Sequence, residues 1–82
     1  MKSMHFIIYG RPNCKFCDEA KSLVTRVGHT FDYRDMSQDR DAYDYVVGQG
    51  FKTVPQIYLA DGDYPEHLGG FYDLRSWLEK RG

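Results

Sequence analysis

The spacing of apolar residues changes twice in the first third of this chain. Residues 5–9 form a short apolar run that ends at Gly10, and their length and β-branched side chains predict a buried strand. Residues 11–13 have the composition of a turn. From Cys14 onward apolar side chains recur at helical spacing until Gly28, so we expect a helix with one buried face.

The pattern returns to strict alternation over residues 30–36, which predicts a second strand with Phe31 and Tyr33 on one side. A second helix is expected to follow, with Ser37 as its N-cap and its end near Gly48 and Gly50. The buried positions of this helix are predicted to be Ala42, Tyr45 and Val46.

The last third of the chain has the pattern of a hairpin and a closing helix. Residues 56–60 predict a third strand, and the turn signal at residues 61–63 predicts that an antiparallel partner follows. That partner is expected at residues 65–68 and at the edge of the sheet, because proline cannot donate to a strand ladder. The final helix is predicted to direct three side chains inward, namely Leu74, Trp77 and Leu78.

The expected order of elements is therefore β-α-β-α-β-β-α. This order predicts the α/β class, with a four-stranded mixed sheet flanked by three helices that lie on both of its faces. The 82 residues, 41% hydrophobic and 16% aromatic, match one small globular domain that spans residues 1–82. We expect this domain to be a monomer.

Charge and hydropathy exclude several classes of function. The net charge is −1 without a basic block, whereas nucleic-acid binding normally needs a concentrated positive surface. No apolar run approaches the length of a membrane span, and the first residues do not resemble a secretory signal. Two cysteines in such a chain predict a cytoplasmic protein whose cysteines are catalytic or bind a metal.

Both cysteines, Cys14 and Cys17, lie where the first predicted helix begins. A helix N-terminus stabilises a thiolate, which is the form that attacks a disulfide. We therefore expect Cys14 to be the exposed nucleophile, and Cys17, on the inward face one turn later, to resolve a mixed disulfide. The nearby charges oppose one another, since Arg11 and Lys15 favour a thiolate while Asp18 and Glu19 disfavour it.

Two other readings of the cysteine pair remain open. A closed zinc site needs four ligands, and the further nitrogen donors, His5, His29 and His67, have no paired spacing. We expect no metal for that reason. The pair could also be two unrelated core cysteines, although turn and charged residues surround Cys14.

Three segments of the chain together resemble the glutaredoxin family. The first is Gly10-Arg11-x-x-Cys14-x-x-Cys17, which resembles the active-site segment of dithiol glutaredoxins. The others, in order and at similar spacing, are residues 53–58 (Thr-Val-Pro-Gln-Ile-Tyr) and residues 69–74 (Gly-Gly-Phe-Tyr-Asp-Leu). The resemblance covers essentially the whole chain, and the small size resembles that of bacterial and phage glutaredoxins.

The resemblance implies a thioredoxin-like fold and a binding surface for glutathione beside the cysteines. It implies that Pro55 is cis and that Val54 offers its main chain to an extended peptide. An aromatic wall is expected from Phe16, although Lys15-Phe16 departs from the Pro-Tyr of many members. Tyr72 is bulkier than the family's usual residue there. The full set of implied glutathione-binding residues is Arg11, Phe16, Thr53, Val54, Pro55, Gly70, Phe71, Tyr72 and Asp73.

The expected activity is that of a glutathione-dependent thiol–disulfide oxidoreductase. It would reduce protein disulfides and glutathione mixed disulfides through Cys14 and Cys17, with glutathione as co-substrate. One alternative is a redoxin that thioredoxin reductase reduces and that donates electrons to ribonucleotide reductase. Another is a dimer that holds a [2Fe–2S] cluster through Cys14 and bound glutathione.

Overall fold

The structure is a computed structural model that describes residues 3–81, and it confirms the predicted α/β class and order of elements. The elements are β1 (His5–Gly10), α1 (Lys15–Arg26), β2 (Thr30–Asp35), α2 (Arg40–Gly48), β3 (Gln56–Leu59), β4 (Glu66–Gly69) and α3 (Phe71–Arg81). The longest helix, α1, has 12 residues. Within residues 3–81 no helix is long and apolar enough to cross a membrane.

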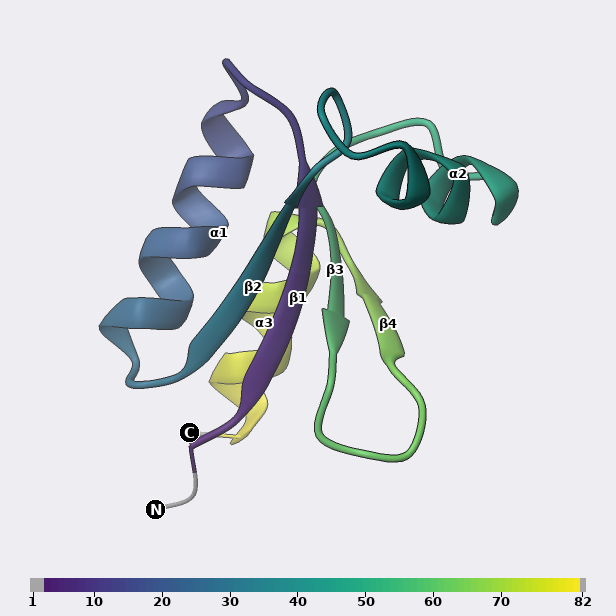
Figure 1. Cartoon of the computed structure of the whole chain (residues 1–82). Coiled ribbons are helices and arrows are strands. Elements are labelled where there is room, and N and C mark those ends of the chain that lie inside the picture. Colours follow the sequence, from purple (N-terminus) through teal and green to yellow (C-terminus); the bar gives the residue numbers. More distant parts are fainter. Residues whose placement is uncertain (1–2, 82) are drawn as a thin grey trace.

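The four strands form one mixed sheet in the order β2-β1-β3-β4 (Figure 1). β1 is parallel to β2 and antiparallel to β3, and β4 pairs antiparallel with β3 at the edge, as predicted. Tyr9 pairs with Gln56, and Ile57 pairs with Gly69. The last residues of β1, the first of β3 and the last of β4 therefore lie at one end of the sheet.

One face of the sheet packs against α1 and α3. Alternate residues of β1, Phe6 and Ile8, point to this face together with Ile57 of β3, and all three are fully buried. The helices contribute Ala20, Leu23, Val24 and Leu74 to the same core. Trp77 and Leu78 pack against it, so the three predicted inward positions of the last helix are confirmed.

The opposite face carries a smaller core made with α2. Tyr9 of β1 and Tyr58 of β3 point to this side, where they pack with Val46 of α2. Figure 1 shows α2 near the end of the sheet from which α1 starts, while α1 and α3 lie together on the other side. The helices thus cover both faces, as the sequence predicts.

The second helix differs from its prediction in two respects. Its N-cap is Asp39 rather than Ser37, and the Asp39 carboxylate accepts a hydrogen bond of 3.2 Å from the N–H of Ala42. Ser37 instead donates its N–H and hydroxyl to the carboxylate of Asp35, at 2.9 and 2.6 Å. Tyr45, predicted to be buried, is 41% exposed because it lies at the edge of a tyrosine cluster rather than beneath it.

The hairpin forms as predicted, with a shift of one residue in its second strand. β4 spans residues 66–69 instead of 65–68, since Pro65 has no N–H and pairing begins between Glu66 and Leu59. Small differences of this kind also occur at the ends of β2 and β3, which stop one residue earlier than expected.

Burial of Tyr58 makes the stability of the fold depend on pH. The side chain is 2% exposed and donates a hydrogen bond of 2.8 Å to the side-chain amide oxygen of Gln49. Burial, with smaller contributions from Tyr45 and Tyr9, raises the pKa of Tyr58 from 10.0 to about 12. The unfolded chain then loses this proton at lower pH than the folded protein. The contribution of protonated Tyr58 to the free energy of unfolding is complete below the pKa that Tyr58 has in the unfolded chain. It is lost as pH rises towards the pKa that Tyr58 has in the folded protein.

We expect the free energy of unfolding to fall between about pH 9 and about pH 11, partly because of Tyr58. Urea unfolding at both pH values measures the change, and a Tyr58→Phe variant should lose less stability over this interval than the wild type. Tyr64→Phe is the matched control, because Tyr64 is 86% exposed. An identical pH dependence in all three proteins would contradict the assignment.

Candidate active site around the cysteine pair

Cys14 is the N-cap of α1. Its backbone is extended (φ −114°, ψ 105°), and its sulfur accepts a hydrogen bond of 3.1 Å from the N–H of Cys17. The carbonyl of Cys14 accepts the first helical bond, from Asp18 N–H at 3.2 Å. Asn13 directs the chain into the helix at φ 59°, a conformation that asparagine tolerates better than most residues. The predicted turn at residues 11–13 is therefore present.

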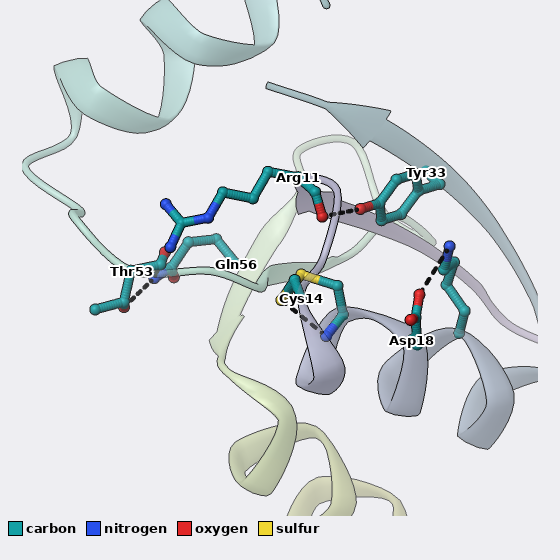
Figure 2. The surroundings of a disulfide bond; sticks show 8 residues. Arg11, Cys14, Asp18, Tyr33, Thr53 and Gln56 are labelled. Carbon is teal, nitrogen blue, oxygen red and sulfur yellow. Dashed lines mark hydrogen bonds and ion pairs between the residues drawn. A yellow bond between two sulfur atoms is a disulfide. The ribbon is translucent and has the colours of Figure 1, made fainter. Parts of the chain in front are cut away.

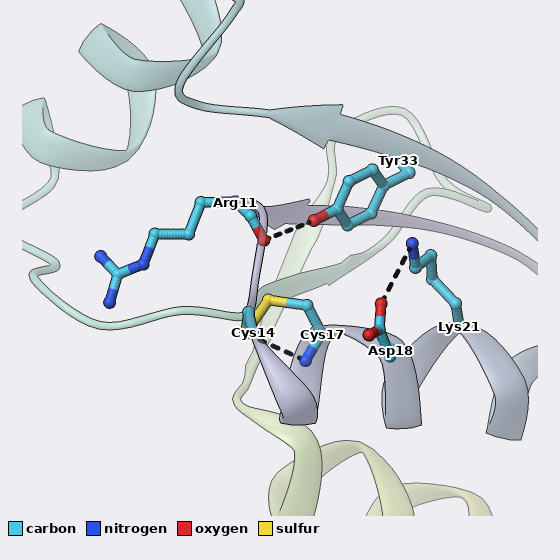
Figure 3. A network of polar contacts seen from close by, with 6 residues as sticks. All are labelled: Arg11, Cys14, Cys17, Asp18, Lys21 and Tyr33. Carbon is cyan, nitrogen blue, oxygen red and sulfur yellow. Dashed lines mark hydrogen bonds and ion pairs between the residues drawn. A yellow bond between two sulfur atoms is a disulfide. The ribbon is translucent and has the colours of Figure 1, made fainter.

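Cys14 and Cys17 form a disulfide, with their Cα atoms 5.2 Å apart (Figure 3). Cys14 is partly exposed, whereas Cys17 is fully buried against the core side of α1. This difference follows from position, since Cys14 precedes the helix and Cys17 lies on its inward stripe. It matches the expected asymmetry between an accessible and a buried sulfur. The expectation that Cys14 is a thiolate concerns the reduced protein and stays a prediction.

The end of β1 is packed tightly beneath the disulfide. A Cβ atom placed on Gly10 would lie 2.7 Å from the Cys17 sulfur and 2.5 Å from the Tyr33 hydroxyl oxygen. That hydroxyl donates a hydrogen bond of 3.3 Å to the Arg11 carbonyl, which links β2 to the turn before α1 (Figure 3). Burial, followed by the charges of Asp35 and Asp18, raises the pKa of Tyr33. The phenol is therefore a neutral structural donor at ordinary pH.

Asp18, the acidic residue in the first turn of α1, forms an ion pair close to the two cysteines. The Asp18 carboxylate lies 3.4 Å from the ammonium of Lys21, which in turn lies 4.1 Å from the centroid of the Tyr33 ring. Figure 2 shows the Arg11 side chain directed away from Tyr33, on the side of Cys14 where Thr53 lies. The Asp18–Lys21 ion pair reduces the unfavourable effect that Asp18 would have on a thiolate.

A second segment of the site is the loop that leads into β3. The Val54–Pro55 peptide bond is cis, as the resemblance implies. The side chain of Gln56 donates to the carbonyl and hydroxyl oxygens of Thr53, at 2.9 and 3.2 Å (Figure 2). Within residues 3–81, the main-chain N–H and carbonyl of Val54 make no hydrogen bond. These two groups are thus available to an extended peptide.

The third segment is the start of α3, which lies against the start of α1. The Phe16 ring stacks on Phe71 with centroids 5.8 Å apart and contacts Tyr72 at 5.5 Å. The Asp73 carboxylate accepts the N–H of Gly70 at 2.9 Å, and a Cβ on Gly70 would lie 3.7 Å from the Pro55 carbonyl oxygen. The α3 terminus therefore adjoins both the cysteine helix and the proline loop.

The structure brings the predicted site residues into three adjacent segments. Phe16 and Tyr72 are 39% and 59% exposed, so an aromatic surface borders the partly exposed Cys14. The Gly70 N–H is already occupied by Asp73, which leaves the first-turn N–H groups of residues 71–73 as donors at this terminus. Sequence reasoning missed Gln56 as a support of Thr53. The available signal was an isolated amide in an otherwise apolar strand.

The described part of the chain offers no ligand set for the zinc alternative. Within residues 3–81, no group of three or more His, Cys, Asp or Glu side chains is placed to hold a metal ion. Each histidine has another partner: His5 lies 3.5 Å from the Asp32 carboxylate, His29 accepts the Met4 N–H at 2.9 Å, and His67 contacts Gln56 at 2.7 Å.

Comparison with known proteins identifies similar chains of matching length. A family model described as "Glutaredoxin" matches residues 6–64. "Glutaredoxin 1" of Salmonella typhimurium is 29% identical over 94 residues, covering 94% of this chain and 93% of that protein. The crystal structure of glutaredoxin 1 from Francisella tularensis, complexed with cacodylate, is similar with a TM-score of 0.70 at 31% identity, covering 96% of both chains.

A further solved structure is also similar to this chain. It is that of NrdH-redoxin from Escherichia coli, a glutaredoxin-like protein with a thioredoxin-like activity profile. The two chains are 25% identical with a TM-score of 0.68, covering 88% of this chain and 93% of that one.

The close packing at Gly10 predicts opposite effects of the same substitution at two glycines. Gly10→Ala should destabilise the oxidised protein by about 1–3 kcal/mol, because the added methyl group must displace the Cys17 sulfur or the Tyr33 ring. Gly48→Ala is the matched control: Gly48 lies in α2 with no atom within 4 Å of an added Cβ, so alanine should be neutral or stabilising by up to about 1 kcal/mol. Urea unfolding measures both. Equal effects at the two positions would contradict this account.

Proposed function

This chain belongs to the glutaredoxin family, and from that premise we propose that it is a glutathione-dependent thiol–disulfide oxidoreductase. Thiol–disulfide exchange itself follows from the family and the Cys14–Cys17 pair. The proposal adds glutathione as the reductant. The observation that supports this most is a partly exposed N-cap cysteine at the end of the sheet where the Val54 main chain and the first turn of α3 have N–H groups that could bind a peptide.

In the proposed first half of the reaction, the Cys14 thiolate attacks one sulfur of a protein disulfide. A mixed disulfide forms, and the other substrate sulfur leaves as a thiolate that takes up a proton. Cys17 then attacks the Cys14 sulfur, which releases the second substrate thiol and forms the Cys14–Cys17 bond. The hydrogen bond from the Cys17 N–H to the Cys14 sulfur would stabilise the thiolate of Cys14 before attack.

In the second half, two glutathione molecules supply the two electrons. The first attacks the Cys14 sulfur, forming a glutathionyl mixed disulfide and freeing Cys17 as a thiol. The second attacks the glutathionyl sulfur, so that reduced Cys14 and glutathione disulfide are the products. With a glutathionylated protein as substrate, Cys14 alone suffices, because the same glutathionyl intermediate forms directly.

The proposed glutathione contacts match the charges of the peptide. Arg11 would lie near the carboxylate at one end, and Thr53 and Val54 would pair with the main chain in the manner of an added strand. The first-turn N–H groups of α3 suit the carboxylate of the γ-glutamyl end, and the Asp73 carboxylate suits its ammonium group. The apolar side of the proposed glutathione site would be formed by the aromatic rings of Phe16, Phe71 and Tyr72. Pro55 and Gly70 would complete the contact surface.

A second candidate function is that of a redoxin that thioredoxin reductase reduces and that donates electrons to ribonucleotide reductase. The similarity to NrdH-redoxin supports this second candidate.

Turnover with glutathione, glutathione reductase and NADPH should exceed turnover with thioredoxin reductase and NADPH by at least about ten-fold, since Arg11 and the α3 terminus fit glutathione. The reverse ratio would favour the second candidate.

Either activity suits a reducing compartment such as the cytoplasm, and we propose that the protein acts there as a monomer.

The two cysteines should respond differently to substitution. Cys14→Ser should abolish both activities, lowering each rate by at least about 1,000-fold, because the attacking sulfur is lost. Cys17→Ser should keep reduction of a glutathionylated peptide within about three-fold of wild type and lose reduction of an intramolecular protein disulfide. Rates measured with both substrates test this, and a Cys14→Ser variant that still reduced the glutathionylated peptide would refute the assignment.

A further inference from the structure

We propose that His67 is a positioning residue for the substrate-binding segment at Thr53 and Val54, and that it acts through Gln56. The inference rests on the proposed function, because it concerns the surface proposed to bind glutathione. Its basis is a continuous chain of hydrogen bonds from the edge strand β4, through a buried amide in β3, to the loop beside Cys14.

Apart from tyrosines, Gln56 is the one buried side chain with a polar group within residues 3–81, and 6% of its surface is exposed. Its amide nitrogen donates to the Thr53 carbonyl and hydroxyl oxygens, at 2.9 and 3.2 Å. Its amide oxygen lies 2.7 Å from Nε2 of His67. The amide nitrogen thus donates to Thr53, and the amide oxygen contacts His67.

These contacts fix the direction of every hydrogen bond in the chain. A backbone carbonyl can only accept, so the side of the Gln56 amide that faces Thr53 must carry the nitrogen. The amide oxygen then faces His67, which must therefore hold a proton on Nε2 and donate it. Without that donor, the Gln56 oxygen would be a buried acceptor without a partner, and rotation of the amide would place it against the Thr53 carbonyl.

The ring of His67 is held in place independently of this hydrogen bond. It stacks on Phe51 with centroids 4.3 Å apart and planes 18° apart, and it lies 5.0 Å from the Tyr58 ring. Phe51 is in turn tied to α2, because its N–H donates to the Val46 carbonyl at 3.3 Å. These ring contacts orient Nε2 towards Gln56, although the His67 residue as a whole is exposed.

Thr53 lies in the loop before β3 and depends on the hydrogen bonds from Gln56. Among residues 3–81, the hydrogen bonds of Thr53 are the two from Gln56, and Val54 makes none. Loss of the amide contact would leave Thr53 without its hydrogen bonds to β3. Glutathione would then have to order this loop on binding, whereas a small dithiol that reduces the disulfide without these contacts would not.

The test compares two reductants of the oxidised full-length protein. In His67→Phe the ring still stacks on Phe51 while the donor is lost. The second-order rate constant for reduction by glutathione should fall about five-fold, equal to about 1 kcal/mol, while that for dithiothreitol stays within about two-fold. The ratio of the two constants is the readout, because general damage to the fold would lower both.

Two further variants separate the donor from the ring. His67→Gln keeps an N–H donor and loses the ring, so it should restore most of the glutathione rate. The matched control is His5→Phe, which replaces a histidine that contacts Thr30 and Asp32 and not Gln56. Its ratio of the glutathione to the dithiothreitol rate constant should equal that of the wild type. Thermal unfolding of each oxidised variant verifies that it is folded.

The outcomes are distinguishable. A lowered ratio in His67→Phe with recovery in His67→Gln supports the inference. An unchanged ratio in His67→Phe, an equal fall with both reductants, or a ratio that His67→Gln lowers just as far overturns it. If wild-type protein is reduced by dithiothreitol but not by glutathione, the proposed function fails and the inference falls with it.

Discussion

The hydrogen bond from the N–H of Cys17 to the sulfur of Cys14 connects the fold of this protein to its chemistry. A helix leaves its first N–H groups without partners, and a side chain at the N-cap usually satisfies one of them with an oxygen atom. Here a sulfur does so, and that sulfur also forms the disulfide with Cys17 one turn later. The stabilisation of the helix terminus and the stabilisation of a thiolate therefore use the same atom. We therefore expect any change in how α1 begins to alter the reactivity of Cys14 in the reduced protein.

Sheet topology explains why three distant segments of the chain meet at that sulfur. β1 ends where β3 begins, since Tyr9 pairs with Gln56, and β4 ends at the same level through the pairing of Ile57 with Gly69. The turn before α1, the loop before β3 and the start of α3 must then share one end of the sheet (Figure 1). The contact between Phe16 and Phe71 brings the two helix termini together across this end. The site is thus a consequence of strand direction and not of any single loop conformation.

Periodicity and spacing predicted the features that depend on local sequence. The strands, the hairpin, the first helix and the asymmetry between Cys14 and Cys17 all follow from which residues are apolar and how far apart they stand. What could not be predicted depends on competition between neighbours. Ser37 is a good capping residue, yet Asp35 binds it and Asp39 caps α2 instead. The resemblance to a family indicated the three segments of the site, but not the bonds that hold them, because these join residues from different strands.

A buried amide in so small a core requires a physical reason. Placing a polar group in an apolar environment is unfavourable unless each of its donors and acceptors finds a partner, and an 82-residue chain has little hydrophobic burial to offset such a cost. Gln56 meets this condition with Thr53 and His67. An apolar residue there would leave the carbonyl and hydroxyl of Thr53 without these hydrogen bonds. The amide is therefore best explained by the hydrogen bonds that it makes on both sides, to Thr53 in the loop before β3 and to His67 on the neighbouring strand.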